Sequence, residues 1–158
     1  MRELNHSLTI AATPLAVLDA FFVPALLRSW WQATRSLCVP RRLGSYAVEW
    51  QPSDDRDEIL GRLGGVFHGT VIDYKPGREC FVAEAYWLPP DGEPIGPMAF
   101  EVRCTPQGSG TVLTVRLSGW ENSSRWTRYY ELMGPAVRES LERLKRVLEQ
   151  ANATPEGS

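Results

Sequence analysis

The sequence contains few of the residues that build metal centres and nucleophilic sites. Two histidines and three cysteines occur among its 158 residues, and neither an HExxH nor a CxxC spacing is present. A Gly-x-Ser-x-Gly nucleophile elbow is absent, as is a glycine-rich phosphate loop that opens a helix. We therefore expect no metal site and no cofactor, and no motif indicates nucleophilic catalysis.

A strong charge of either sign and a long apolar run are also missing. The formal net charge is −2, which does not favour a nucleic-acid partner, because such proteins bind largely by neutralising phosphates. No uninterrupted apolar run approaches the ~20 residues of a membrane-spanning helix. We expect neither nucleic-acid binding nor a membrane span.

The N-terminus and the cysteines indicate the compartment. The first six residues lack the apolar stretch and the small-residue cleavage site of a signal peptide. Cys38, Cys80 and Cys104 are odd in number and widely spaced, so we interpret them as reduced thiols that are buried as small hydrophobic groups. Both features predict a cytoplasmic protein.

Large aromatic residues, by contrast, are abundant. The chain has six tryptophans, five tyrosines and five phenylalanines within an ordinary globular composition of 43% hydrophobic and 23% charged residues. So many large amphipathic rings suit either a broad core or a lined cavity. The length suits one domain with a real core, which we place at residues 1–150.

The clearest periodic pattern lies near the C-terminus. Apolar residues recur there every three or four positions over 23 residues, and the intervening positions are mostly polar. This spacing predicts one long helix with a single apolar face, which needs a large apolar partner. The face consists of Trp126, Tyr130, Met133, Val137, Leu141, Leu144 and Leu148.

Two features modify this helix. Pro135 lies inside it, off the apolar face, and removes one backbone hydrogen bond, so we expect a kink or a split nearby. Residues 151–158 read as a flexible polar tail.

Upstream of the helix, alternating apolar and polar residues predict strands. Thr13-Pro14 and Pro24 begin two short helices after the first strand. The order is therefore a strand, two short helices, a meander of about six strands and a long helix, which is the pattern of an α+β fold. The predicted strands cover residues 4–10, 46–50, 59–60 with 66–74, 80–87, 98–104 and 113–117.

Several short motifs follow one another in a characteristic order. They begin with an alanine–proline entry into a helix, continue with a short helix that ends in paired tryptophans, and close with the last strand and the terminal helix. The segments are Ile10–Val17, Leu27–Trp31, Arg42–Tyr46, Gly69–Asp73 with Pro76, Gly110–Leu117 and Leu141–Leu144. Over about residues 3–149 the chain resembles the START-like (SRPBCC, helix-grip) superfamily, and within it most resembles the family related to the C-terminal domain of the Hsp90 ATPase activator.

The resemblance implies a curved antiparallel sheet of about six to seven strands, wrapped around the long C-terminal helix. It also implies a cavity between the sheet and that helix. Two residues depart from the family pattern. Ser45 replaces a usual glycine, and Val137 stands where members often carry a tryptophan, a change that could widen or reshape the cavity.

Three polar residues interrupt apolar strand faces. His6 could be a hydrogen-bonded or half-exposed residue near a strand end, and His68 could face either side of its strand. Glu84 shares a face with Val82 and Tyr86, which could point its carboxylate into the concave side as an acid–base group or a ligand anchor. After a strand bulge, Glu84 would instead point outward.

The aromatic residues supply most of the candidate ligand-binding site. Trp30 and Trp31 are adjacent on a helix and should diverge by roughly 100°, so we expect one in the core and the other at the cavity mouth. The candidate site residues are Trp30, Trp31, Tyr46, Trp50, His68, Glu84, Tyr86, Phe100, Trp126, Tyr130, Met133 and Val137.

Three functions fit these expectations. The favoured one is a non-enzymatic module that binds a small apolar or aromatic molecule in the cavity. The second is an enzyme similar to the polyketide cyclases, with a cavity carboxylate or histidine as its acid–base group. The third is a protein-interaction module similar to the Hsp90 activator domain, with a protein partner or a homodimer, which an exposed apolar patch around Phe22, Leu26 and Trp31 would favour.

Overall fold

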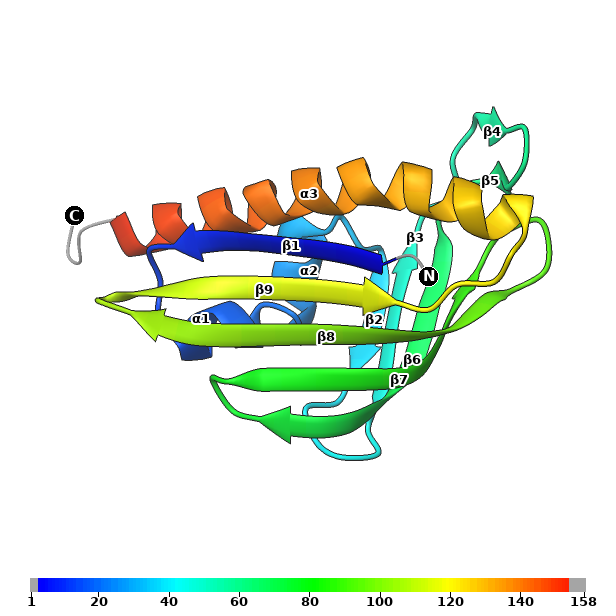
Figure 1. Ribbon diagram of the computed structural model, residues 1–158. Coiled ribbons are helices and arrows are strands. Elements are labelled where there is room, and N and C mark those ends of the chain that lie inside the picture. The colour runs from blue at the N-terminus through cyan, green and yellow to red at the C-terminus, as the bar shows by residue number, and fades with distance from the viewer. Residues whose placement is uncertain (1–2, 154–158) are drawn as a thin grey trace.

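The computed structural model describes residues 3–153, and a seven-stranded antiparallel sheet dominates it (Figure 1). Its strands are β1 (Glu3–Ile10), β2 (Arg35–Cys38), β3 (Ser45–Trp50), β6 (Gly65–Lys75), β7 (Glu79–Leu88), β8 (Ile95–Gln107) and β9 (Gly110–Ser118). They lie in the order β1-β9-β8-β7-β6-β3-β2. The predicted α+β fold and strand number are confirmed, and β2, an edge strand that the sequence pattern did not reveal, completes the sheet.

Three helices lie inside the curve of the sheet: α1 (Pro14–Asp19), α2 (Pro24–Trp30) and α3 (Ser124–Ala153). A proline begins each of the two short helices, where its missing N–H costs nothing. The Thr13 hydroxyl accepts a hydrogen bond from the Ala16 N–H and caps α1. The Ser123 hydroxyl does the same for α3 through the Trp126 N–H.

The long helix α3 runs the length of the sheet beside β1 (Figure 1). All seven residues of the predicted apolar face are buried or half-buried, so the helix turns this face to the sheet. It remains one α-helix through Pro135, which is exposed, so the freed carbonyl of Glu131 lies at a solvent-facing position. The predicted split does not occur.

The end of α3 differs from the sequence-based boundary. The helix continues to Ala153, and the Asn152 side chain donates a hydrogen bond to the Ala11 carbonyl at 2.6 Å. Residues 151–153, which we predicted as the start of the tail, therefore belong to the helix. Its remainder, residues 154–158, lies outside the described residues.

A bulge in β7 determines which of its side chains face inward. Val82 pairs with Phe100 of β8, but the next pair along, Ala85 with Met98, leaves one extra residue on β7. Glu84 takes this position with a φ of 52°. Inward-facing side chains therefore change from the even to the odd positions along the strand.

A small hairpin, β4 (Arg56–Asp57) and β5 (Gly61–Arg62), projects beside the first turns of α3 (Figure 1). We predicted a strand at Ile59 and Leu60, which is wrong because both residues form the turn of this hairpin. The Asp57 carboxylate accepts hydrogen bonds from their two backbone N–H groups at 3.0 and 2.9 Å. This capping holds the turn closed.

The remaining expectations concern membrane and redox state. No helix among the described residues is long and apolar enough to span a membrane. Cys38, Cys80 and Cys104 are all free thiols. Burial raises the pKa of each to about 12, so all three behave as inert hydrophobic groups.

Candidate functional site

A cavity of about 350 Å³ lies between the inner face of the sheet, α2 and α3. Every strand of the sheet except β2 contributes at least one residue to the lining of this cavity. Its lining residues are Leu4, His6, Phe21, Trp30, Trp31, Gln32, Trp50, Gln51, Leu63, Gly64, Phe67, Trp87, Phe100, Val115, Leu117, Tyr129, Met133, Ala136, Val137, Ser140 and Leu141.

The structure brings half of the twelve candidate residues together at this cavity. The six that line it are Trp30, Trp31, Trp50, Phe100, Met133 and Val137. The six that do not are Tyr46, His68, Glu84, Tyr86, Trp126 and Tyr130. The residues on the wall are aromatic or aliphatic, whereas the second group includes both polar candidates, Glu84 and His68.

The two adjacent tryptophans do not diverge. Their rings stack with centroids 4.7 Å apart and planes inclined by 12°, and both line the cavity. Trp30 is 1% exposed in the core and Trp31 is half-buried, but the expectation that the two rings diverge is wrong. Trp31, the C-cap residue of α2, keeps a helical backbone with a φ of −99° and a ψ of −5°. The 100° offset therefore applies to the two Cα–Cβ bonds, and the side-chain torsions bring the rings together.

Four tryptophans line the cavity: Trp30, Trp31, Trp50 and Trp87. Three of the four have their indole N–H bonded to a backbone carbonyl, which satisfies the polar atom. The bonds run from Trp30 to Ala20 at 2.8 Å, from Trp50 to Trp31 at 2.8 Å, and from Trp87 to Gly64 at 2.7 Å. These bonds also fix the orientation of the rings.

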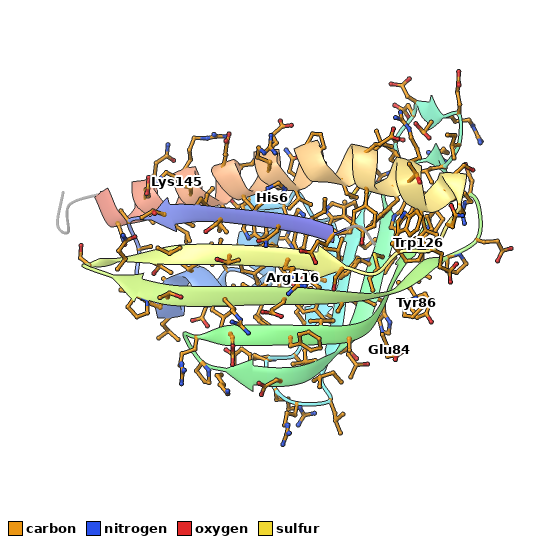
Figure 2. All side chains as sticks on the ribbon, viewed as in Figure 1. His6, Glu84, Tyr86, Arg116, Trp126 and Lys145 are labelled. Carbon is orange, nitrogen blue, oxygen red and sulfur yellow. The ribbon has the colours of Figure 1, made fainter. Side chains whose placement is uncertain are left out.

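Glu84 and Tyr86 lie on the outer face of the sheet, away from α3 (Figure 2). The bulge at Glu84 exposes its carboxylate, so of the two interpretations the outward one is correct. Tyr86 covers Gly96, where even a methyl group would clash with its ring. By the same change of alternation, Trp87 enters the cavity.

Tyr46 and His68 miss the cavity for different reasons. Tyr46 is fully buried behind it, where its hydroxyl donates to the Phe21 carbonyl at 2.8 Å and its ring packs 5.8 Å from Phe100. His68 is exposed because the residues of β6 that face inward are its neighbours, Phe67 and Gly69. Tyr46 therefore supports the wall, and His68 belongs to the surface.

Trp126 (Figure 2) and Tyr130 lie near the start of α3, and neither lines the cavity. Their rings lie 6.5 Å apart, and the Tyr130 hydroxyl donates a hydrogen bond to the Gly119 carbonyl after β9. They anchor the helix to the sheet. Tyr129, which sequence reasoning missed, takes the place at the cavity wall that we expected for Tyr130.

His6 is a half-buried residue of β1 that lines the cavity beneath α3 (Figure 2). Its Nε2 lies 3.2 Å from the backbone carbonyl oxygen of Gly134 on α3. His6 is thus both hydrogen-bonded and half-exposed, as we expected. It also lines the cavity, which we considered for His68.

Tyr129 lies on α3, lines the cavity and is 3% exposed. Its ring lies 5.5 Å from that of Trp87, which fixes the position of both. Burial, with a smaller contribution from Tyr130, raises the pKa of the Tyr129 hydroxyl well above its ordinary value. The hydroxyl is therefore neutral and remains a hydrogen-bond donor.

Exposed lining residues mark the mouth of the cavity. Gln32, Gln51 and Ala136 are exposed, and Ser140 is half-exposed. They come from the end of α2, the end of β3 and the middle of α3. The mouth therefore lies between these three elements.

Charge is absent from this wall. Within residues 3–152, no Asp, Glu, Lys or Arg lines the cavity, and no group of acidic, histidine or cysteine side chains there could hold a metal ion. A charged ligand group would therefore be buried without a partner, at a high free-energy cost. The cavity suits an uncharged ligand with apolar or aromatic surfaces.

A curved antiparallel sheet closed by a long C-terminal helix around an apolar cavity defines a helix-grip domain of the START-like (SRPBCC) superfamily. The chain belongs to the family described as polyketide cyclase / dehydrase and lipid transport, whose model matches residues 1–149. No curated protein sequence matches the chain.

Solved structures with low sequence identity share the fold. Protein MLL2253 from Mesorhizobium loti is 18% identical with a TM-score of 0.72, over 94% of this chain and 98% of that one. A protein from Rhodobacter sphaeroides is 20% identical with a TM-score of 0.72, over 97% and 95%. The Aha1 dimer from Colwellia psychrerythraea is 14% identical with a TM-score of 0.66, over 94% and 97%. At these identities the likeness concerns the fold alone.

Proposed function

We propose that this protein binds a small, uncharged apolar or aromatic molecule in the cavity between the sheet and α3. The observation that carries the proposal is the cavity itself: about 350 Å³, walled by stacked aromatic rings and aliphatic side chains, with no charged residue among those described. This volume lies in the range of roughly 300–1,000 Å³ that is typical of small-molecule sites.

The aromatic residues of the wall support an aromatic ligand. Trp30, Trp31 and Trp50 form a continuous aromatic surface, with ring centroids 4.7 and 5.3 Å apart. Phe100 extends it, 6.0 Å from Trp31. An aromatic ligand would gain ring–ring contacts of about 0.5–1.5 kcal/mol each in addition to the burial of its apolar area.

The cyclase-like alternative keeps one observation in its favour. His6 lies on the cavity wall and could exchange a proton with a bound ligand. Glu84, which we considered for the same role, is on the outer face and has no access to the cavity. We favour binding over catalysis because the described wall offers no carboxylate to pair with the histidine.

The protein-interaction alternative has less support. Phe22 is buried, and Leu26 and Trp31 are half-buried, so these three residues do not form the expected exposed patch; the exposed apolar side chains of this region are Leu15 and Val23. A homodimer remains a prediction, which the dimeric state of the Aha1 protein from Colwellia psychrerythraea encourages. The cytoplasmic location also remains a proposal, and the three free cysteines are consistent with it.

Titration with N-phenylnaphthylamine, an uncharged aromatic probe, tests the proposed function. We expect saturable enhancement of its fluorescence with one site per chain, and a raised melting temperature. At a free probe concentration of about 100 times Kd, the free energy of unfolding should increase by about 2.7 kcal/mol. Signal without saturation, or no thermal shift, would contradict a functional cavity.

Two matched variants locate the bound probe. Val137→Trp adds a ring to the cavity wall and should abolish binding while the far-UV spectrum stays that of the parent. Ile72→Trp adds the same side chain on the exposed outer face of β6 and should bind the probe like the parent. Equal binding by both variants would place the probe elsewhere.

A further inference from the structure

Two polar groups on the cavity wall have hydrogen-bonding capacity that the protein itself leaves unused. One is the hydroxyl of Tyr129, which has no hydrogen-bond partner among the described residues. The other is Nδ1 of His6, whose ring is fixed through its other nitrogen. Apart from the indole N–H of Trp31 and the polar residues of the mouth, the rest of the wall is apolar, so these two groups are available to orient a ligand.

The contact with Gly134 decides the role of each nitrogen of His6. A backbone carbonyl oxygen only accepts hydrogen bonds, so Nε2, which lies 3.2 Å from it, must carry the proton and donate. In the neutral imidazole the other nitrogen then has no proton. Nδ1 is therefore an acceptor and matches a hydroxyl group of a ligand.

Tyr129 offers the proton that Nδ1 of His6 lacks. Its hydroxyl is neutral, so it can donate a hydrogen bond as well as accept one, and its side chain is 3% exposed at the cavity wall. By contrast, the hydroxyl of the neighbouring Tyr130 has a partner, because it donates a hydrogen bond to the Gly119 carbonyl. The unpaired hydroxyl of Tyr129 matches an acceptor such as a ligand carbonyl.

We propose that the cavity selects uncharged aromatic ligands that carry a carbonyl-type acceptor, held by the Tyr129 hydroxyl, and a hydroxyl donor, held by Nδ1 of His6. The inference rests on the proposed binding function and adds the chemical class of the ligand. Tyr129 and Gly134, the contact of His6, are five residues apart on α3. This is about 7.5 Å of helix rise between the two positions, a span comparable to the length of a ligand of two or three rings.

Four compounds on one scaffold test the two groups separately. Para-hydroxybenzophenone has the carbonyl and the hydroxyl, benzophenone has only the carbonyl, para-benzylphenol has only the hydroxyl, and diphenylmethane has neither. Their affinities are measured by displacement of N-phenylnaphthylamine. We expect para-hydroxybenzophenone to bind about tenfold or more tightly than diphenylmethane, and the other two compounds to lie between them.

Substitutions assign each preference to a residue. Tyr129→Phe should remove the advantage of the carbonyl compounds and keep that of the hydroxyl compounds, and His6→Phe should do the reverse. Tyr130→Phe and His68→Phe are the matched controls, because the Tyr130 hydroxyl is used by Gly119 and His68 is exposed. Both controls should keep the full order of affinities. The four-compound series on the parent protein is decisive even where a variant fails to fold.

The outcomes separate the two proposals. Equal affinity for all four compounds, or preferences that survive Tyr129→Phe and His6→Phe, would overturn this inference and leave the binding function standing. Failure of N-phenylnaphthylamine and of all four compounds to bind would overturn the binding function, and this inference with it.

Discussion

At the scale of single residues, backbone conformation decides which side chains reach the cavity. Glu84 adopts a positive φ of 52° at the bulge of β7. This one extra residue turns Tyr86 outward and Trp87 inward. The sequence offers a signal for it in retrospect, because the changed alternation buries Ala85 and Trp87 and leaves the carboxylate in water.

The left-handed conformation at Glu84 leads to a stability prediction. Side chains with a Cβ atom are disfavoured there, whereas glycine is not. We expect Glu84→Gly to be more stable than Glu84→Ala by about 1 kcal/mol in urea unfolding. Both variants should bind N-phenylnaphthylamine like the parent because position 84 is on the outer face. An alanine variant as stable as the glycine variant would contradict the strained conformation.

At the scale of elements, α3 and most strands of the sheet could be predicted, because their apolar periodicity extends over many residues. Short elements could not. β2 has four residues, and the β4–β5 hairpin is held by the side chain of Asp57 rather than by a hydrophobic face. The single proline in α3 does not divide the helix, since its exposed position avoids the cost of a buried, unpaired carbonyl.

The hairpin is attached to α3 by an ion pair. Nε and Nη2 of Arg128 each lie 2.8 Å from Oδ1 of Asp57, whose side chain is 7% exposed. The hydrogen bond from Arg128, followed by those from the backbone N–H groups of Leu60 and Ile59, lowers the pKa of Asp57. Leu63 and Gly64, just after the hairpin, line the cavity, so this attachment also helps to shape one wall.

The lowered pKa of Asp57 gives the attachment a predictable pH dependence. The ionised carboxylate stabilises the folded state at pH values above about 4, and this contribution is lost as the pH falls through the folded-state pKa. We therefore expect Asp57→Asn to lower the urea midpoint at pH 7, and the difference from the parent to shrink at progressively more acidic pH.

A more exposed ion pair serves as the control for Asp57. The pKa of Glu49 is lowered by Arg35 in the same sense, but the Arg35 side chain is 82% exposed. Because solvent and salt screen such pairs, Glu49→Gln should change the midpoint less than Asp57→Asn. A deficit of Asp57→Asn that is the same at pH 7 and at low pH would contradict the role of the charge.

At the scale of the whole molecule, the cavity is a joint product of the sheet, α2 and α3. The composition alone indicated enough aromatic rings for a broad core or a cavity wall. The helix periodicity placed Met133 and Val137 on the apolar face of α3, which lines the cavity. Trp87, Tyr129 and His6 became recognisable as wall residues only once the strand bulge, the helix end and the packing of β1 against α3 were known.

The central claim, that ligands enter this cavity, is tested most directly by the six tryptophans. In a ¹⁵N-labelled protein each indole N–H gives its own NMR signal. Trp30, Trp31, Trp50 and Trp87 line the cavity, whereas Trp120 and Trp126 do not. Saturation with N-phenylnaphthylamine should shift the first four signals and leave the last two in place. Shifts confined to Trp120 and Trp126, or small shifts spread evenly over all six, would contradict binding in the cavity.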